Sequence, residues 1–318
     1  MSLKRLTIFN CPKLTDLPEG KRLPPILEYL DLRHCHNLQQ LPSDLCNLKS
    51  LTEFRVEGCK MLKSFPHMDL PGTLKRLVVQ GCDALTTIPM KLVGNNSALE
   101  YLEIGRCSSL ETFLDQGEFS TTLINIRIYN CKKLKLLPHG IMSENTKLEY
   151  FEMDNCPSVK SFPDGQLPTT LKRLQVSNCN NLSSLAANLP SLGNLEYLEV
   201  SGCPNLECFP SGAWRILSLR CIKIEDSENL KSLPDGFYNL KNLKELEIRD
   251  CPNLEYLPKQ GLPSSLRSLS ITECKNLSSP DGWKLHKLKS LKFLTLGGFL
   301  GFVSFSSDYL LPHSITEL

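Results

Sequence analysis

Apolar residues along this chain follow one pattern that returns about every 24 residues. Each copy approximates the frame L-x-x-L-x-[I/V/L]-x-x-C-x-x-L-x-x-[L/F]-P, and the first copy begins with Leu3, Leu6, Ile8 and Cys11. A fixed period of roughly 20–50 residues indicates a repeat solenoid, and this period falls in the leucine-rich range. The frame restarts at Leu27, Leu51, Leu74, Leu99, Leu123, Leu148, Leu171, Leu195, Leu219, Leu243, Leu266 and Leu291.

The L-x-[I/V/L] core of each copy alternates with period two, which predicts a short strand with one buried face. The proline near the end of the frame closes the coil, because proline fixes its own φ and cannot continue a helix or a central strand. We therefore predict an α/β repeat solenoid, a leucine-rich repeat horseshoe with a parallel β-sheet on its concave face and mostly irregular convex segments. We expect residues 1–318 to form a single array of about thirteen repeats, with a truncated fourteenth that opens at Leu311.

Cysteine marks the end of nearly every predicted strand. Ser227 and Phe299 replace it in two repeats, which a strict disulfide framework would not tolerate. The N-terminal residues 1–7 lack the apolar core of a signal peptide, which favours a reducing, cytoplasmic location. We therefore expect reduced thiols that pack as small hydrophobes in the core. The eleven cysteines in the frame are Cys11, Cys35, Cys59, Cys82, Cys107, Cys131, Cys156, Cys179, Cys203, Cys251 and Cys274.

Charge and motifs argue against several classes of function. The formal net charge is +2, so nothing global attracts the chain to nucleic acid or to an acidic membrane. The longest apolar stretch, residues 294–305, is interrupted by glycine, threonine and serine, so we expect no membrane span. His34, Cys35 and His36 are the closest histidine and cysteine grouping, but strand alternation should direct Cys35 away from both neighbours. With no motif of a nucleotide-binding loop, a zinc protease or a serine hydrolase, we predict neither catalysis, nor a metal, nor a cofactor.

Function must then be argued from residues that point outward from the sheet. The position inside L-x-L alternates in charge along three runs: Asp31–Arg55, Glu103–Arg127–Glu152 and Glu199–Lys223–Glu247. Side chains on adjacent strands of the sheet, which we call adjacent rungs, can pair such charges directly. One interpretation of this surface is therefore a self-neutralised, solvated face, in which each exposed pair contributes only about 0–1 kcal/mol.

The other interpretation is a protein-binding surface on four consecutive repeats, which we call the middle patch. Aromatic and arginine side chains are favoured interface anchors, and apolar side chains at outward positions here should cluster. The alternative is that the tyrosines of a shared Glu-Tyr-[Leu/Phe] pattern merely stack over neighbouring rungs. A second candidate surface is the basic set Lys244, Arg267 and Lys292, which suits an acidic partner or another domain of a receptor. The middle patch comprises Val78, Tyr101, Arg106, Ile124, Arg127, Tyr129, Tyr150 and Glu152.

The repeat frame resembles a known family. Its C-x-x-L-x-x-[L/F]-P step, as in Cys59-Lys60-Met61-Leu62-Lys63-Ser64-Phe65-Pro66, is similar to the leucine-rich repeats of plant intracellular nucleotide-binding immune receptors. The Leu-Pro-Ser-Ser-Leu-Arg-Ser-Leu-Ser-Ile run at 262–271 is similar too, and the coiled-coil class of those receptors is the nearer likeness. The resemblance covers essentially the whole chain.

The resemblance implies a protein-recognition module that binds a pathogen effector or a guarded host protein. It also implies a contribution to autoinhibition through the nucleotide-binding domain of the parent receptor. The chain itself has no phosphate-binding loop, so nucleotide switching is not carried over. The alternative function is a leucine-rich repeat adaptor that delivers substrates to a ubiquitin ligase. An upstream F-box would indicate the adaptor, and an upstream nucleotide-binding domain would indicate the receptor.

Overall fold

The computed structural model describes most of the chain, in two compact units. Unit 1 contains residues 1–159 and 163–168, and unit 2 contains residues 160–162 and 169–318. The described residues are 3–17, 23–43, 45–66, 70–89, 98–114, 121–144, 146–212, 214–234, 236–258, 260–278, 283–300 and 311–317.

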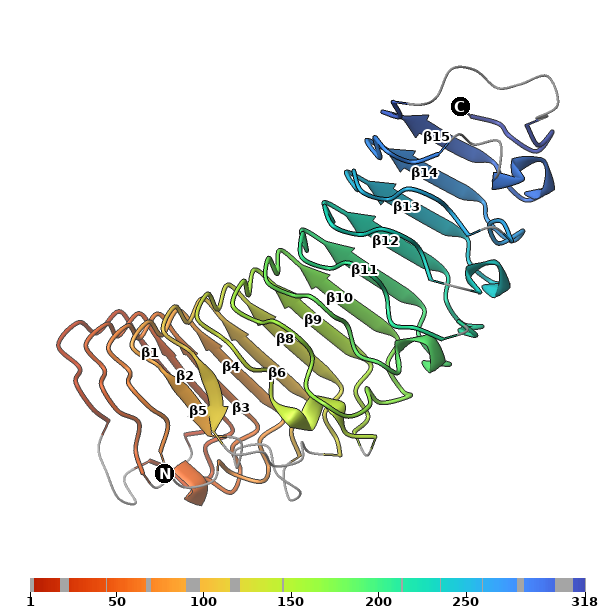
Figure 1. The fold of residues 1–318 in the computed structure, drawn as a ribbon. Coiled ribbons are helices and arrows are strands. Elements are labelled where there is room, and N and C mark those ends of the chain that lie inside the picture. The colour runs from red at the N-terminus through yellow and green to blue at the C-terminus, as the bar shows by residue number, and fades with distance from the viewer. Residues whose placement is uncertain are drawn as a thin grey trace. The chain divides into compact units, whose positions relative to one another are not determined.

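Unit 1 is built on parallel strands that follow one another in chain order, one per repeat (Figure 1). Equivalent positions of the frame are paired, so that Leu30 lies between Leu6 and Phe54 in the register. A small second sheet pairs β5 with β7 after the strand region of two repeats. The strands are β1 (Arg5–Phe9), β2 (Tyr29–Arg33), β3 (Glu53–Glu57), β4 (Arg76–Gln80), β5 (Thr87–Pro89), β6 (Tyr101–Gly105), β7 (Thr112–Leu114), β8 (Asn125–Tyr129) and β9 (Tyr150–Asp154).

Unit 2 repeats the same arrangement with parallel strands in chain order. Its register is again one repeat per step, with Leu198 paired to Ile222 and Ile222 to Leu246. The strands are β10 (Arg173–Ser177), β11 (Tyr197–Ser201), β12 (Cys221–Glu225), β13 (Glu245–Arg249), β14 (Ser268–Thr272) and β15 (Phe293–Gly297).

Each strand of the main sheet coincides with the predicted L-x-[I/V/L] core, and from β2 to β14 its two apolar residues are buried. The outward residue between them is partly exposed in most strands but buried in β2, β4 and β6. In β13, Leu246 and Ile248 are 1% and 0% exposed, whereas Glu247 between them is partly exposed. The predicted parallel-sheet solenoid is thus confirmed. Short 3-10 turns take the place of α-helices in the described connections: η1 (Leu45–Asn47), η3 (His139–Met142), η4 (Leu189–Ser191), η5 (Phe237–Asn239) and η7 (Leu285–Lys287).

The cysteine position closes the core at the end of each strand. Ten of the eleven cysteines in the frame are buried, Cys11 is partly exposed, and all fourteen cysteines of the chain are free. The Cys203 thiol lies 3.4 Å from the carbonyl oxygen of Ser201, and the Ser227 hydroxyl makes the equivalent bond to Glu225 at 3.2 Å. Burial raises the pKa of Cys203 to about 11, which keeps the thiol protonated as a donor. The prediction that these thiols pack in the core is confirmed.

The residue before the cysteine position has a positive φ in every repeat with a described main-sheet strand, including the two in which Ser227 and Phe299 replace the cysteine. The repeat frame did not predict this conformation. Values run from 48° at Asp226 to 73° at Gly298. This left-handed conformation turns the chain out of the strand, and glycine, asparagine and aspartate adopt it most readily. Most repeats supply one of these residues or histidine, whereas Arg106 and Glu273 do not.

A single array over residues 1–318 stays a prediction. In a stack of repeats each repeat contacts chiefly its neighbours. Each of the two compact units is therefore a run of consecutive repeats with the same kind of core, and the division does not define two different domains. The truncated fourteenth repeat is described from Leu311 to Glu317, and Glu317 forms an isolated bridge with Phe293.

Candidate protein-binding face

The middle patch lies on strands β4, β6, β8 and β9 of unit 1. The register places Val78, Glu103, Arg127 and Glu152 in one row across these strands. The strands therefore bring the predicted residues onto the outward side of one sheet, as the repeat frame requires.

Val78 does not contribute exposed surface, contrary to our expectation. Its side chain is 0% exposed, although it occupies the outward position inside L-x-L. Its partners in the register are Arg55 and Glu103, and the stems of such long side chains cover apolar neighbours. The prediction that Val78 is an exposed apolar anchor was wrong for this reason.

The buried carboxylate of Glu103 is the centre of a network that we call the central cluster, formed by Gln80, Tyr101, Glu103, Arg106 and Tyr129. Glu103 is 6% exposed and accepts hydrogen bonds from the Tyr101 hydroxyl, from Gln80 Nε2 at 2.5 Å and from the Tyr129 hydroxyl at 3.3 Å. Arg106 donates to Gln80 Oε1 at 3.0 Å. A buried carboxylate with several donors is well satisfied, so this cluster holds its side chains in fixed positions.

The two phenols of the central cluster stay protonated well into the alkaline range. Burial raises the pKa of Tyr101, and its hydrogen bond to Glu103 raises the pKa further. Burial also raises the pKa of Tyr129. Both hydroxyls therefore act as hydrogen-bond donors at neutral pH.

Two backbone features adapt the chain to this cluster. A Cβ added to Gly105 would lie 2.2 Å from the nearest atom of the Tyr129 ring, so the ring keeps its present position only beside a glycine. Arg106 has a φ of 54° at a position where every other repeat except the one with Glu273 uses glycine, asparagine, aspartate or histidine. An arginine in this conformation costs about 1 kcal/mol, and here its side chain bonds Gln80 of the cluster.

Tyr101 belongs to an arrangement that recurs along the chain. The guanidinium of Arg76, one rung earlier, lies 3.7 Å from the centre of the Tyr101 ring, while the Tyr101 hydroxyl bonds the acid two residues later. The same three parts recur as Arg5, Tyr29 and Asp31, and as Arg173, Tyr197 and Glu199. Stacking over neighbouring rungs is thus the role of these tyrosines, as the alternative interpretation expected.

Tyr150 departs from that arrangement. Its partner one rung earlier is Asn125 instead of an arginine, and the acid two residues later, Glu152, is held by Arg127 at 3.0 Å. The Tyr150 side chain is 40% exposed, and within the described residues its hydroxyl has no hydrogen-bond partner. An exposed aromatic ring without internal partners is available to bind another molecule.

Ile124 lies beside Tyr150 at the start of the strands. The amide of Tyr150 donates to the carbonyl oxygen of Ile124 at 3.1 Å, and the Ile124 side chain is partly exposed. We call Ile124, Arg127, Tyr150 and Glu152 the Tyr150 edge. The middle patch therefore divides into an internally bonded central cluster and an outward Tyr150 edge.

Arg76, Gln80 and Gly105 are not among the residues predicted from the sequence. A signal for Arg76 was present, because an arginine stands 24 or 25 residues before each stacked tyrosine. No comparable signal marks Gln80 or Gly105, whose roles depend on the position of the Tyr129 ring and of Glu103.

The predicted pairing of charges between rungs is correct in part. Arg127–Glu152 and Lys223–Glu247 form ion pairs of 3.0 and 3.2 Å. Asp31 and Arg55 are neighbours in the register, but each pairs within its own strand: Asp31 with Arg33, and Arg55 with Glu57 at 3.5 Å. A partner two residues along the strand lies on the same face, so it competes with the neighbour on the next rung.

The histidine and cysteine grouping at residues 34–36 does not have the arrangement of a metal site. Cys35 is buried, while His36 is exposed and its Nδ1 lies 2.8 Å from the carbonyl oxygen of Gly58. Among the residues with described positions, no three His, Cys, Asp or Glu side chains gather as metal ligands would. The same residues include no helix with the length and apolar character needed to cross a membrane.

Three features define a leucine-rich-repeat protein. Each repeat has one main-sheet strand, the strands pair in parallel from one repeat to the next, and a C-x-x-L turn follows the strand. A family model for leucine-rich repeats of plant disease resistance proteins of the RPS2-like type matches residues 157–259, and a general leucine-rich-repeat model matches residues 27–48. The chain is homologous to plant disease resistance proteins.

Individual relatives show the extent of this likeness. An Arabidopsis thaliana protein, At3g14460, whose name describes it as a candidate disease resistance protein, is 34% identical over 96% of this chain. The disease resistance protein RPP4 of the same plant is 30% identical over 36% of the chain, and the TMV resistance protein N of Nicotiana glutinosa is 31% identical over 28%. The chain spans only 18%, 10% and 8% of the length of these three relatives.

Among solved structures, the leucine-rich repeat domain of the type III effector XopL superposes with a TM-score of 0.51 at 22% identity. The match covers 65% of this chain and 71% of that domain. It supports the fold alone.

Proposed function

We propose that this chain is the protein-recognition module of a plant immune receptor, which binds a pathogen effector or a host protein through the Tyr150 edge. The observation that carries the proposal is an exposed tyrosine that lacks the stacked arginine of its counterparts, on a chain homologous to plant disease resistance proteins. The central cluster holds the neighbouring rungs rigid, so the edge is presented without a large ordering cost.

The finer parts of the proposal rest on the sequence resemblance. They are membership of the coiled-coil class, a cytoplasmic location, and a contribution to autoinhibition through contact with the nucleotide-binding domain of the parent receptor. Recognition without catalysis agrees with a solenoid fold whose outward face carries tyrosine and paired charges.

A comparative capture experiment tests the role of the Tyr150 edge. The full chain, a Tyr150→Ala variant and a Tyr238→Ala variant are each immobilised and exposed to extract of infected and healthy plant tissue. Proteins held by the full chain are then purified and titrated against all three. Removing a central aromatic anchor weakens an interface by about 2 kcal/mol, so we expect binding to Tyr150→Ala to fall about thirtyfold.

Tyr238 is a matched control because it is 43% exposed but lies in η5, in the segment that connects β12 to β13. Its replacement should leave affinity unchanged. Equal affinity of both variants for every purified partner would contradict a role for the Tyr150 edge. A partner lost equally from both variants would place recognition elsewhere, and circular dichroism of each variant establishes that the fold is retained.

A further inference from the structure

A row of positively charged residues runs along unit 2 at the pre-strand position, which is the residue directly before a main-sheet strand. Arg220, Lys244, Arg267 and Lys292 take this position before β12, β13, β14 and β15. We call these four residues the basic ladder. Backbone hydrogen bonds of 2.8 Å join each later member to the carbonyl oxygen of the member before it, so the four stand on successive rungs.

The basic ladder is not neutralised as lysines at the same position in unit 1 are. There, Lys4 pairs with Glu28 at 2.7 Å and Lys75 pairs with Glu100 at 3.1 Å, each with the next rung. In the part of the chain that the structure describes, no member of the ladder has a carboxylate oxygen within 4.0 Å. Like charges on neighbouring rungs destabilise a sheet, so fold stability does not explain the row.

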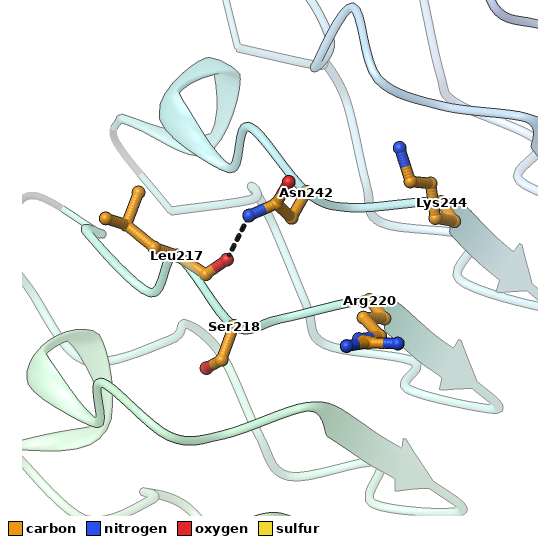
Figure 2. Close-up of a pocket in the computed structure, with 5 residues that line it drawn as sticks. All are labelled: Leu217, Ser218, Arg220, Asn242 and Lys244. Carbon is orange, nitrogen blue, oxygen red and sulfur yellow. Dashed lines mark hydrogen bonds between the residues drawn. The ribbon is translucent and has the colours of Figure 1, made fainter.

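Two members of the ladder line a hollow of about 320 Å³, together with Leu217, Ser218 and Asn242 (Figure 2). The neutral polar groups of this hollow are already bonded. Asn242 Nδ2 donates to the carbonyl oxygen of Leu217 at 2.7 Å, and the Ser218 hydroxyl donates to a carbonyl oxygen of the preceding rung at 2.6 Å. The Arg220 and Lys244 head groups are therefore the donors left to bind a ligand, and an anion is what they suit.

We propose that the basic ladder binds an acidic segment of another polypeptide in an extended conformation. Adjacent rungs lie about 4.8 Å apart, so the four cations cover about 14 Å. An extended chain advances about 3.3 Å per residue, so three carboxylates at alternate positions cover about 13 Å on one side. A segment with aspartate or glutamate at every second residue thus complements the ladder in the sign of its charge and matches it in length, with three carboxylates facing four cations.

The surroundings favour a single narrow strand over a nucleic-acid duplex. The row ends at Glu196, which holds the pre-strand position before β11, and the neighbouring Glu245 stands at the first residue of β13. Deeper on the face, Lys223 is already paired with Glu247 at 3.2 Å. A duplex with two charged backbones would meet these carboxylates, whereas one acidic strand along the ladder avoids them. This surface lies in unit 2, and its role does not depend on the Tyr150 edge.

Binding of a designed probe tests the proposal on the full chain. The probe is a fluorescent peptide in which glutamate alternates with serine, and a peptide of equal composition with its glutamates in one block serves as comparison. We expect saturable binding by fluorescence anisotropy that weakens as salt is raised, with the alternating peptide bound more tightly. The double variant Arg220→Gln, Lys244→Gln should bind the alternating peptide about tenfold more weakly.

The control variant Lys4→Gln, Lys75→Gln removes the same two charges from the same frame position in unit 1, and it should change affinity by less than about twofold. Equal losses in both double variants would overturn the proposal, since only net charge would then matter. No saturable binding of the alternating peptide at low salt would overturn it as well. Tighter, ladder-dependent binding of a single-stranded oligonucleotide would replace the acidic polypeptide with a nucleic acid as the ligand.

Discussion

Gly105 and Gly297 hold the same place, the last residue of a strand, but among the described residues only Gly105 has a close neighbour. The Tyr129 ring fills the space beside Gly105, whereas no atom of a described residue lies within 4 Å of a Cβ added to Gly297. The frame position is the same, so the difference comes from the next rung: Tyr129 pairs with Gly105 in the register, whereas β15 is the last strand of the sheet in the described part of the chain. Single residues on this face are thus constrained by their neighbours across the sheet.

We predict that Gly105→Ala lowers the free energy of unfolding by about 1–3 kcal/mol, because the Tyr129 ring must leave its place over the strand and its bond to Glu103. Gly297→Ala should leave that free energy unchanged or raise it by up to about 1 kcal/mol. Urea unfolding followed by circular dichroism measures both.

A double-mutant cycle identifies the cause. If the ring is responsible, the cost of Gly105→Ala disappears in a Tyr129→Ala background. An undiminished cost in that background would show that the backbone, rather than the ring, rejects the methyl group.

At the scale of the repeat, the cysteine position combines packing with one hydrogen bond. The carbonyl oxygen that faces the Cys203 thiol also accepts a 2.8 Å bond from the amide of Asn178. The carbonyl therefore remains satisfied whatever side chain follows. Volume is then the property that this position selects, which explains why serine at 227 is accepted in the same place.

We predict that Cys203→Ser and Ser227→Cys change the free energy of unfolding by about 1 kcal/mol or less, and in opposite directions, because hydroxyl and thiol make the same bond. Cys203→Leu should lower it by about 1–3 kcal/mol through overpacking. Urea unfolding of the three variants provides the comparison. A serine variant as unstable as the leucine variant would show that the thiol itself, rather than its volume, is required.

At the scale of each unit, the protection of a strand from solvent depends on having a neighbouring strand on both sides. Leu6 and Ile8 of β1 are partly exposed, whereas Leu30 and Leu32, one rung further in, are both 0% exposed. In unit 2, Leu296 of β15 is partly exposed while Ile271 of β14 is 0% exposed. A repeat gains its stability from the interfaces with adjacent repeats, so these strands should open first.

We therefore predict that amides of β1 exchange with solvent at least about tenfold faster than those of β3, and amides of β15 faster than those of β13. Hydrogen exchange measured by mass spectrometry on the full chain gives these rates. Uniform exchange along the strands of a unit would mean that the unit opens as one cooperative block, contrary to this expectation.

The sequence by itself determined the strands, their parallel order and the buried face, because a period of about 24 residues with an alternating core admits one stacking of neighbours. It also placed the middle patch on one face and named the basic ladder except for Arg220. Tertiary structure decided which of those outward residues are available. Val78 is covered by its neighbours, Tyr101 is bonded to Glu103 beneath a stacked arginine, and Tyr150 is left exposed. The physical reason is that direction follows from local periodicity, whereas exposure depends on side chains one rung away, about 24 residues distant in the sequence.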